Sequence, residues 1–172
     1  MAGASPDAGP DTGPVPSPET LRVRRIWDKM APGFDKQMRF FERVLFPGAR
    51  EWACSQANGR VLEIAVGTGR NFSYYPEGVD LSGIEYSPAM LAIAHEKARE
   101  LGREVDLRLG DAQALEFSDD AFDTVVCTIS LCSIPDDRAA VHEAVRVLRP
   151  DARRVGVPSR VLKKGWMEVL KP

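Results

Sequence analysis

The sequence has little of what marks several classes of protein. Its 172 residues include three cysteines, an odd number that builds no framework of disulfides, so we expect them to pack as small apolar residues in a reducing, cytoplasmic setting. No apolar run approaches the roughly 20 residues that cross a bilayer, and the longest, residues 122–134, contains several polar side chains. The first residues lack the basic and apolar regions of a signal peptide. We therefore expect no stable insertion into a membrane.

An excess of one charge is also absent. The 23 lysines and arginines nearly balance the 25 acidic residues and give a net charge of −2, so nothing points to binding of nucleic acid or of an anionic membrane. The two histidines are expected to be surface or core residues of helices, and no metal site is expected. With 44% hydrophobic and 28% charged residues, the chain suits one globular domain with a substantial core.

Composition and patterning divide the chain into a Pro- and Gly-rich tail (1–19), a helical segment (20–58), a core of strands and helices (59–150) and a basic tail (151–172). The first tail holds five of the thirteen prolines and is expected to be disordered. In the helical segment, apolar spacing starts near Thr20, and a second helix over residues 35–54 is interrupted at Pro47-Gly48. The basic tail has six lysines or arginines and two acids.

Strands are expected to alternate with helices in the core. Four apolar runs predict strands, over residues 61–66, 81–86, 105–109 and 122–129. A helix is expected to begin at Ser87-Pro88. Another is expected to be capped by Asp136 or Asp137, to carry Leu148 on its apolar face and to end at Pro150. Strands joined by helices imply right-handed crossovers, so the predicted fold class is α/β with a parallel sheet.

Three features of the core are expected to meet at one edge of this sheet. Gly67 and Gly69 follow the first strand, where a glycine pair lets the backbone turn tightly and approach a ligand. The acidic residue Glu85 ends the second strand, and Asp111 follows the third. Because the carboxyl ends of parallel strands share an edge, these residues predict a ligand site there.

At these residues the sequence resembles the class I S-adenosylmethionine-dependent methyltransferases, most of all a small bacterial group related to ubiquinone/menaquinone-type and phospholipid N-methyltransferases. The matching motifs occur in family order, at residues 27–35, 63–69, 83–91, 110–115, 122–126 and 147–150. The resemblance implies a Rossmann-like parallel sheet with helices on both faces. It also implies S-adenosylmethionine as the cofactor and a small-molecule or lipid-like methyl acceptor.

The resemblance assigns roles to the turn after the first strand. Gly67 and Gly69 would cradle the methionine part of the cofactor, with Thr68 and Asn71 at its edge. Ala65 stands where many members have the first glycine of the turn. Residues 27–35 would cover the cofactor as part of a lid.

The adenosine part would lie against the next two strands. Glu85 would accept hydrogen bonds from both ribose hydroxyls, a task that suits a carboxylate, and Asp111 would accept one from the adenine amino group. Both acids could instead be solvated residues at strand ends. The residues implied to lie beside the adenine are Tyr86, Met90, Ala112 and Gln113, of which Tyr86 and Met90 could instead be ordinary core.

Three further residues are implied at the site. Cys127 and Thr128 would line the side that faces the sulfonium, although Thr128 could be a plain strand residue. Glu63 either contacts the ligand or serves only as an acceptor that caps the glycine turn. No histidine or lysine is placed as a general base, so no catalytic residue is nominated.

The resemblance fails after Pro150. The family has two glycines and a strongly apolar fifth strand there, whereas this chain has a basic stretch that includes Pro158. We expect that residues 151–172 are not family sequence, that the last strands are missing, and that residues 122–129 form an exposed edge unless the tail covers them. A truncated or frame-shifted reading frame would explain this switch.

Two other functions stay open beside an impaired methyltransferase. The first is a non-catalytic module that binds the cofactor or a partner. The second is an NAD-dependent oxidoreductase, which fits less well because the turn lacks a third glycine.

Overall fold

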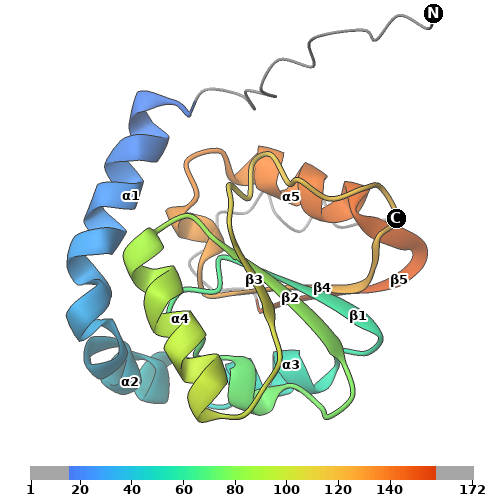
Figure 1. The fold of residues 1–172 in the computed structure, drawn as a ribbon, viewed down its shortest axis with the longest axis horizontal. Helices are drawn as coiled ribbons and strands as arrows, with labels where there is room; N and C mark the ends of the chain where they lie inside the picture. The colour runs from blue at the N-terminus through green and yellow to red at the C-terminus, as the bar shows by residue number, and fades with distance from the viewer. Residues whose placement is uncertain (1–15, 158–172) are drawn as a thin grey trace, which may run out of the picture.

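The computed structural model describes residues 16–157 of the chain. Within this range, five parallel strands form one sheet in the order β3-β2-β1-β4-β5 (Figure 1). The strands are β1 (Arg60–Ile64), β2 (Asp80–Glu85), β3 (Asp106–Leu109), β4 (Phe122–Thr128) and β5 (Leu148–Val157). The predicted α/β class with a parallel sheet is confirmed.

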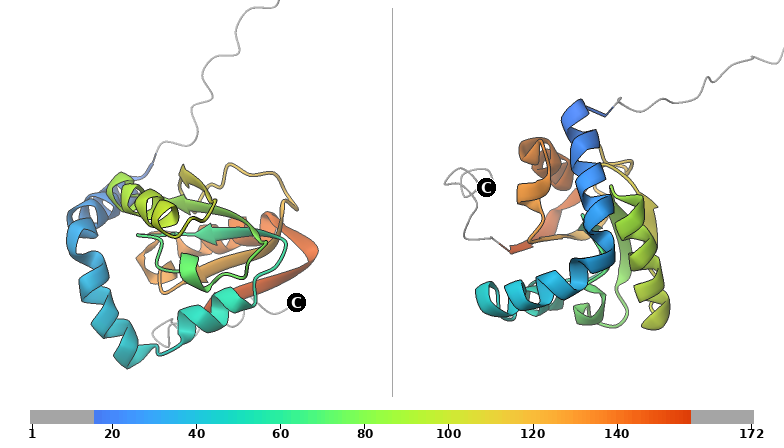
Figure 2. Two further views of the ribbon diagram at one scale, coloured as in Figure 1. Left: turned by 60° about the horizontal axis from the view of Figure 1, so that its bottom comes forward. Right: turned by 90° about the vertical axis from the view of Figure 1, so that its left-hand side faces the viewer.

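The helices cover both faces of the sheet and one side of it. Those longer than three residues are α1 (Pro18–Met30), α2 (Phe34–Leu45), α3 (Ala49–Ser55), α4 (Pro88–Glu100) and α5 (Asp137–Arg146). Three short 3₁₀ turns occur at η1 (Ala31–Gly33), η2 (Phe72–Tyr74) and η3 (Leu131–Ser133). Figure 1 shows α3 and α4 on one side of the sheet and α5 on the other, while α1 and α2 form an arm at the periphery (Figure 2).

Local signals set several helix ends where the sequence predicts them. The Ser87 hydroxyl caps α4 by accepting the N–H of Met90 at 3.2 Å. Of the two predicted caps for α5, Asp136 is the one used, and its carboxylate accepts the N–H of Ala139 at 2.9 Å. The predicted interruption separates α2 from α3, where Gly48 has a φ of +72°. The arm begins earlier than expected, because Pro18 rather than Thr20 is the first residue of α1.

Two predictions at the end of the core are wrong. Helix α5 ends at Arg146, and Leu148 begins β5 instead of continuing the helix. A proline disfavours helical backbone at the residue before it, so Pro150 favours extended backbone at Arg149. Residues 151–157 are not outside the fold, because they pair with β4 from Thr124 opposite Arg153 to Thr128 opposite Val157. The β4 strand is therefore no exposed edge.

An irregularity in the ladder accommodates Pro150 within β5. Phe122 pairs with Leu148, whereas Thr124, two residues further on, pairs with Arg153. Residues in such a bulge do not take part in the regular ladder of hydrogen bonds. A proline, which has no backbone N–H to donate, is tolerated there. The predictions for residues 1–15 and 158–172 lie outside the described residues.

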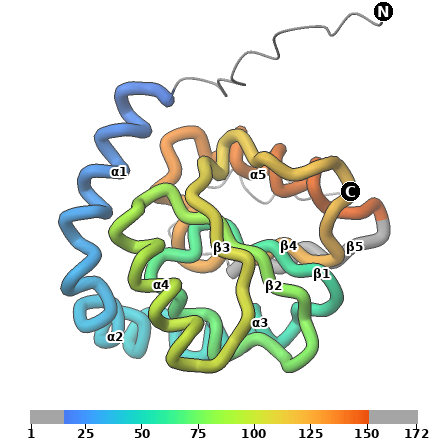
Figure 3. The backbone as a smooth tube through the Cα atoms, viewed as in Figure 1, coloured from blue at the N-terminus to red at the C-terminus, as the bar shows by residue number. Residues whose placement is uncertain are grey.

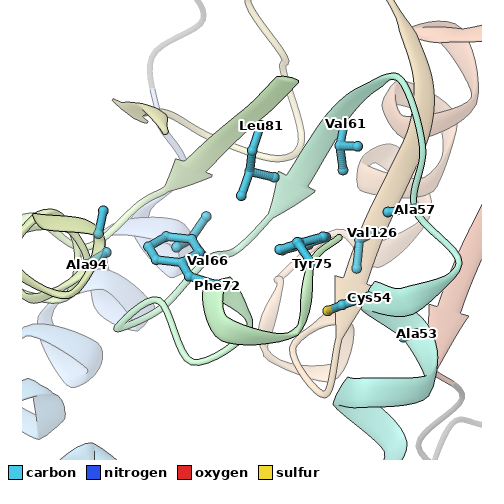
Figure 4. Packing of buried hydrophobic residues seen from close by; sticks show 11 residues of the cluster. Ala53, Cys54, Ala57, Val61, Val66, Phe72, Tyr75, Leu81, Ala94 and Val126 are labelled. Carbon is cyan, nitrogen blue, oxygen red and sulfur yellow. The ribbon is translucent and has the colours of Figure 1, made fainter. Parts of the chain in front are cut away.

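The sheet separates two hydrophobic clusters. The cluster on the α3 and α4 side contains Phe72 and Tyr75 packed with strand residues such as Val61 and Val126 (Figure 4). The cluster on the α5 side includes Leu62, Ile64, Val125 and Ala140. Successive residues of β1 point to opposite faces of the sheet, and because both faces are covered, residues on both sides are buried.

The order of the strands determines where a ligand can bind. The chain passes from β1 out to β2 and β3, then crosses back to β4 and continues outward to β5 (Figure 3). Strand order therefore reverses between β1 and β4, and in open parallel sheets ligands bind at the carboxyl side of such a point.

Across residues 16–157, no helix is both long enough and apolar enough to cross a membrane.

Candidate functional site

A cavity opens at the carboxyl edge of the sheet, where the strand order reverses. It encompasses about 880 Å³ of empty space, part of it continuous with solvent. Its floor comes from the residues that follow β1, β2, β3 and β4, and its roof comes from α1 and α2. The predicted residues that line it are Ala65, Gly67, Glu85, Tyr86, Met90, Asp111, Ala112, Gln113 and Thr128.

The turn after β1 brings backbone to the cavity wall. Gly67 has a φ of +61°, and a Cβ there would have only the Phe34 ring within 4.0 Å, so the turn faces open space. Gly69 also has a positive φ, but a Cβ there would lie 2.5 Å from the Phe72 ring. Gly67 therefore lines the cavity, whereas Gly69 is required by packing against Phe72.

Strained backbone also borders the cavity. Ala65 and Ile129 follow β1 and β4, both line the cavity, and both have a φ of +55° although neither is a glycine. Left-handed backbone costs an L-residue with a Cβ roughly 1–2 kcal/mol, and such residues gather at functional sites. This conformation explains why glycine would suit the position of Ala65.

The Glu85 carboxylate joins the first two strands at the cavity. One oxygen accepts the N–H of Gly67 at 2.8 Å, and the other accepts the N–H of Ser87 at 2.9 Å. Burial raises the pKa of Glu85 above its usual value, although the two N–H donors oppose that rise. Each carboxylate oxygen has two acceptor positions, so each retains one for a ligand.

Asp111 and Gln113 form the next part of the wall. The Asp111 carboxylate accepts the backbone N–H of Gln113 at 2.9 Å and its side-chain amide at 2.8 Å. The Gln113 amide oxygen in turn accepts the N–H of Asp136 at 2.9 Å, which ties the end of β3 to the start of α5. Asp111 is thus held in position with its second oxygen only weakly engaged, by the same amide at 3.1 Å.

Tyr86 places its hydroxyl group in the wall of the cavity. Its hydroxyl is buried and has no hydrogen-bond partner within the described part of the chain. The Arg24 guanidinium lies 5.6 Å from the centre of the ring. Met90 is 2% exposed and, like Tyr86, lines the cavity. Both side chains therefore provide apolar surface there.

Five predicted site residues, Glu63, Thr68, Gly69, Asn71 and Cys127, do not line the cavity. Glu63 lies beneath it and accepts from the Asn71 amide at 2.8 Å and from the Tyr75 hydroxyl at 2.9 Å. Glu63 is therefore an acceptor for two side chains that follow the glycine turn. Burial raises the pKa of Glu63 to about 7.

Thr68 and Cys127 have partners within the protein instead. The Thr68 hydroxyl donates to the Asp35 carboxylate of α2 at 2.5 Å. The Cys127 sulfur lies 3.3 Å from the Ser130 hydroxyl, and burial raises the pKa of Cys127 to about 11. Cys127 is therefore a neutral thiol near pH 7.

Two arginines at the cavity were not predicted from the sequence. Glu42 of α2 accepts from Arg50 at 2.5 Å and from Arg70 at 2.7 Å, and both arginines line the cavity. Although burial alone would raise it, these two hydrogen bonds lower the pKa of Glu42. Arg50 also donates to Thr128 at 2.8 Å. No sequence spacing marks this cluster, because its members come from α2, α3 and the glycine turn.

The roof is tied to the core at its other end by Asp28. This carboxylate of α1 accepts the Ser87 hydroxyl at 2.5 Å, at the N-terminus of α4. Trp27 and Phe34 then pack edge to face with their ring centres 5.9 Å apart, and both line the cavity. Two residues of the segment expected to be part of a lid therefore line the cavity.

The described residues hold no cluster of metal ligands, and two common types of general base are absent from the cavity lining. No cluster of three or more histidine, cysteine or acidic side chains there could hold a metal ion. No histidine or lysine is among the residues that line the cavity.

Comparison with known proteins points to one family. A family profile described as a methyltransferase domain matches residues 62–155. The match includes residues 151–155, so the expectation that family sequence ends at Pro150 is wrong.

The chain is also similar to individual proteins that are named methyltransferases. The chain is 41% identical over 109 residues to a phosphatidylethanolamine N-methyltransferase of Cereibacter sphaeroides, with 62% of the chain and 54% of the relative covered. It is 38% identical over 141 residues to a demethylmenaquinone methyltransferase of Thermus thermophilus, with 76% and 62% covered. The chain thus spans less than two thirds of the length of these relatives.

A solved structure is also similar. It is a SAM-dependent methyltransferase from Thermotoga maritima, with 28% identity and a TM-score of 0.57 over 76% of this chain and 60% of that one.

The strain at Ala65 can be tested by Ala65→Gly. We expect the free energy of unfolding to rise by about 1 kcal/mol, because glycine adopts a φ of +55° without the Cβ clash. The control is Ala92→Gly on the exposed face of α4, which should lose about 1 kcal/mol. Urea unfolding of both variants measures the two changes, and a loss of stability in both would show that Ala65 is unstrained.

The buried Glu63 predicts a dependence of stability on pH. Its pKa is about 7 in the folded protein against an ordinary value of 4.5, so the folded state binds more protons between these values. This contribution to stability is present below pH 4.5 and is lost as the pH rises through 7. We expect the free energy of unfolding to fall by at most ~3 kcal/mol across this window.

The Glu63→Gln variant should flatten that slope, as measured by urea unfolding at several pH values. Glu96→Gln, on the exposed face of α4, is the matched control and should keep the wild-type slope. Equal slopes for wild type and Glu63→Gln would refute the assignment.

Proposed function

The chain belongs to the methyltransferase domain family, and we propose that it transfers a methyl group from S-adenosylmethionine to a small-molecule or lipid-like acceptor held in the cavity. The observation that carries this proposal is the placement of Glu85, Asp111 and the Gly67 backbone around one cavity. These three features come from the ends of β1, β2 and β3, as a cofactor that spans the carboxyl edge requires.

The residues present fit the cofactor of this family. Glu85 offers both carboxylate oxygens to a pair of hydroxyls, and its geometry is fixed by two backbone donors. Open space at Gly67 admits a ligand beside the turn. Tyr86 and Met90 provide an apolar surface for a flat ring, and Asp111 lies on the same wall to accept from an amino group.

Methyl transfer needs positioning more than covalent catalysis. The cofactor supplies an electrophilic methyl group on a sulfonium, which leaves as a neutral thioether. The task of the chain is then to align the acceptor and to keep water out. Helices within residues 20–58 act as the lid, because Trp27, Phe34 and Met38 close the roof with apolar side chains.

The acceptor is proposed to lie between this lid and the end of β4. The Thr128 hydroxyl oxygen accepts from both Arg50 and Asn71 at 2.8 Å, which uses its two lone pairs. Its own proton is therefore available to the cavity, so Thr128 acts as a donor to the acceptor molecule. An amine or an activated carbon that already carries the reacting electron pair fits this site without a general base.

Glu85→Gln tests the cofactor site. The amide nitrogen would face the N–H of either Gly67 or Ser87, and two donors cannot form a hydrogen bond with each other. The variant would therefore lose one bond that fixes the turn and one acceptor for the ribose hydroxyls. We expect affinity for S-adenosylhomocysteine, measured by calorimetry, to fall on the order of a hundredfold. Asp111→Asn should weaken binding less, because it removes one contact.

Glu96→Gln controls for the loss of a carboxylate, and thermal melting confirms that each variant folds. Affinity in Glu85→Gln equal to that of Glu96→Gln would overturn the proposed site, as would preferential binding of NAD. Turnover with aminophospholipid and quinone-precursor acceptors then separates an enzyme from a module that only binds the cofactor.

A further inference from the structure

The outer face of α2 exposes large apolar side chains. Phe40 is 76% exposed, Val44 60% and Leu45 53%, and Trp52 of the adjacent α3 is 58% exposed. Residues three and four apart share a face of a helix, so Phe40 and Val44 lie next to each other. Figure 2 shows α2 at the periphery of the molecule, on the arm formed with α1. An apolar surface of this kind marks an interaction site.

The charges of α2 are sorted between its two faces. Its acids Asp35 and Glu42 point inward and pair with cationic side chains, Glu42 with Arg50 and Arg70 and Asp35 with Lys97 at 3.2 Å. Its basic residues Lys36, Arg39 and Arg43 are all exposed. The surface that flanks Phe40 and Val44 therefore carries three cations from α2 and no acid from that helix.

The net charge of the whole chain does not reveal this separation of charges. Residues 18–45 contain seven lysines or arginines and four acids, whereas residues 46–150 contain ten and seventeen. The helical arm is thus basic and the body beside it acidic, although the chain as a whole is nearly neutral. A charge balance taken over the whole sequence misses a local basic surface of this kind.

We propose that the outer face of α2, defined by Lys36, Arg39, Phe40, Arg43 and Val44, docks on an anionic phospholipid surface. A short helix with an apolar stripe bordered by basic residues lies in the plane of a bilayer interface. Each nearby lysine or arginine then gains attraction to anionic headgroups. A symmetric dimer through this face would instead place three cations of one copy against three of the other.

The apolar surface continues from this face into the cavity. Phe34, Met38, Phe41 and Leu45 follow one another at spacings of four, three and four, which places them along one stripe of α2. Phe34 and Met38 line the cavity, whereas Phe41 and Leu45 are exposed. On a docked molecule this stripe would lead from the lipid surface to the acceptor site, a consequence that rests on the proposed function.

Vesicle co-sedimentation of the full 172-residue chain tests the docking. The chain should bind vesicles of phosphatidylcholine mixed with phosphatidylglycerol much more tightly than vesicles of phosphatidylcholine alone, and added salt should weaken the binding. The triple variant Lys36→Gln, Arg39→Gln and Arg43→Gln should lower the partition coefficient on the order of a hundredfold. Its control removes the same charge from exposed sites elsewhere, with Arg99→Gln, Arg108→Gln and Arg138→Gln, and should bind like wild type.

A second pair of variants tests the apolar contribution. Phe40→Ser with Val44→Ser should weaken binding to the mixed vesicles at least about tenfold, whereas Leu101→Ser with Leu109→Ser, exposed residues of the body, should not. Calorimetry with S-adenosylhomocysteine on the same variants keeps the two proposals apart, since α2 variants should retain wild-type affinity for it.

Three outcomes would overturn the docking while leaving the cofactor site intact. They are an absence of binding to the mixed vesicles, equal binding by the α2 variants and their controls, and self-association that depends on Phe40 and Val44 without vesicle binding.

Discussion

The carboxylate of Glu85 is the contact on which the rest of the site depends. Its two oxygens receive the N–H groups of Gly67 and Ser87, so one side chain fixes the glycine turn, the end of β2 and the start of α4 together. Burial of this carboxylate disfavours its charged form, and the two backbone donors compensate in part. Glu85 lines the cavity, so we propose that the acceptor positions that remain on its oxygens bind the cofactor.

Ion pairs and a hydrogen bond attach the arm of α1 and α2 to the rest of the site. Glu42 on α2 lies between Arg50 and Arg70, and the Asp28 carboxylate on α1 accepts from Ser87. The arm is thus connected to Ser87, whose backbone N–H the Glu85 carboxylate accepts. These inward contacts occupy the acids of α2 and leave its cations outside, so the packing that closes the cavity also gives the arm its basic outer face.

The sequence predicts the floor of the site better than its roof. Gly67 after the first strand, Glu85 at the end of the next strand and the Ser87 cap are local signals, and each lies where its spacing predicts. Arg50 and Arg70 gave no such signal, because only the tertiary fold brings them to Glu42. Strand β5 was missed because it is held by pairing of backbone N–H and C=O groups, which the composition of a segment does not reveal.

A crystal structure of the chain with S-adenosylhomocysteine tests the central claim most directly. The account predicts both ribose hydroxyls within hydrogen-bonding distance of the Glu85 carboxylate and the adenine ring between Tyr86 and Asp111. A nucleoside bound elsewhere on the molecule, with the Glu85 carboxylate turned away from it, would contradict the account.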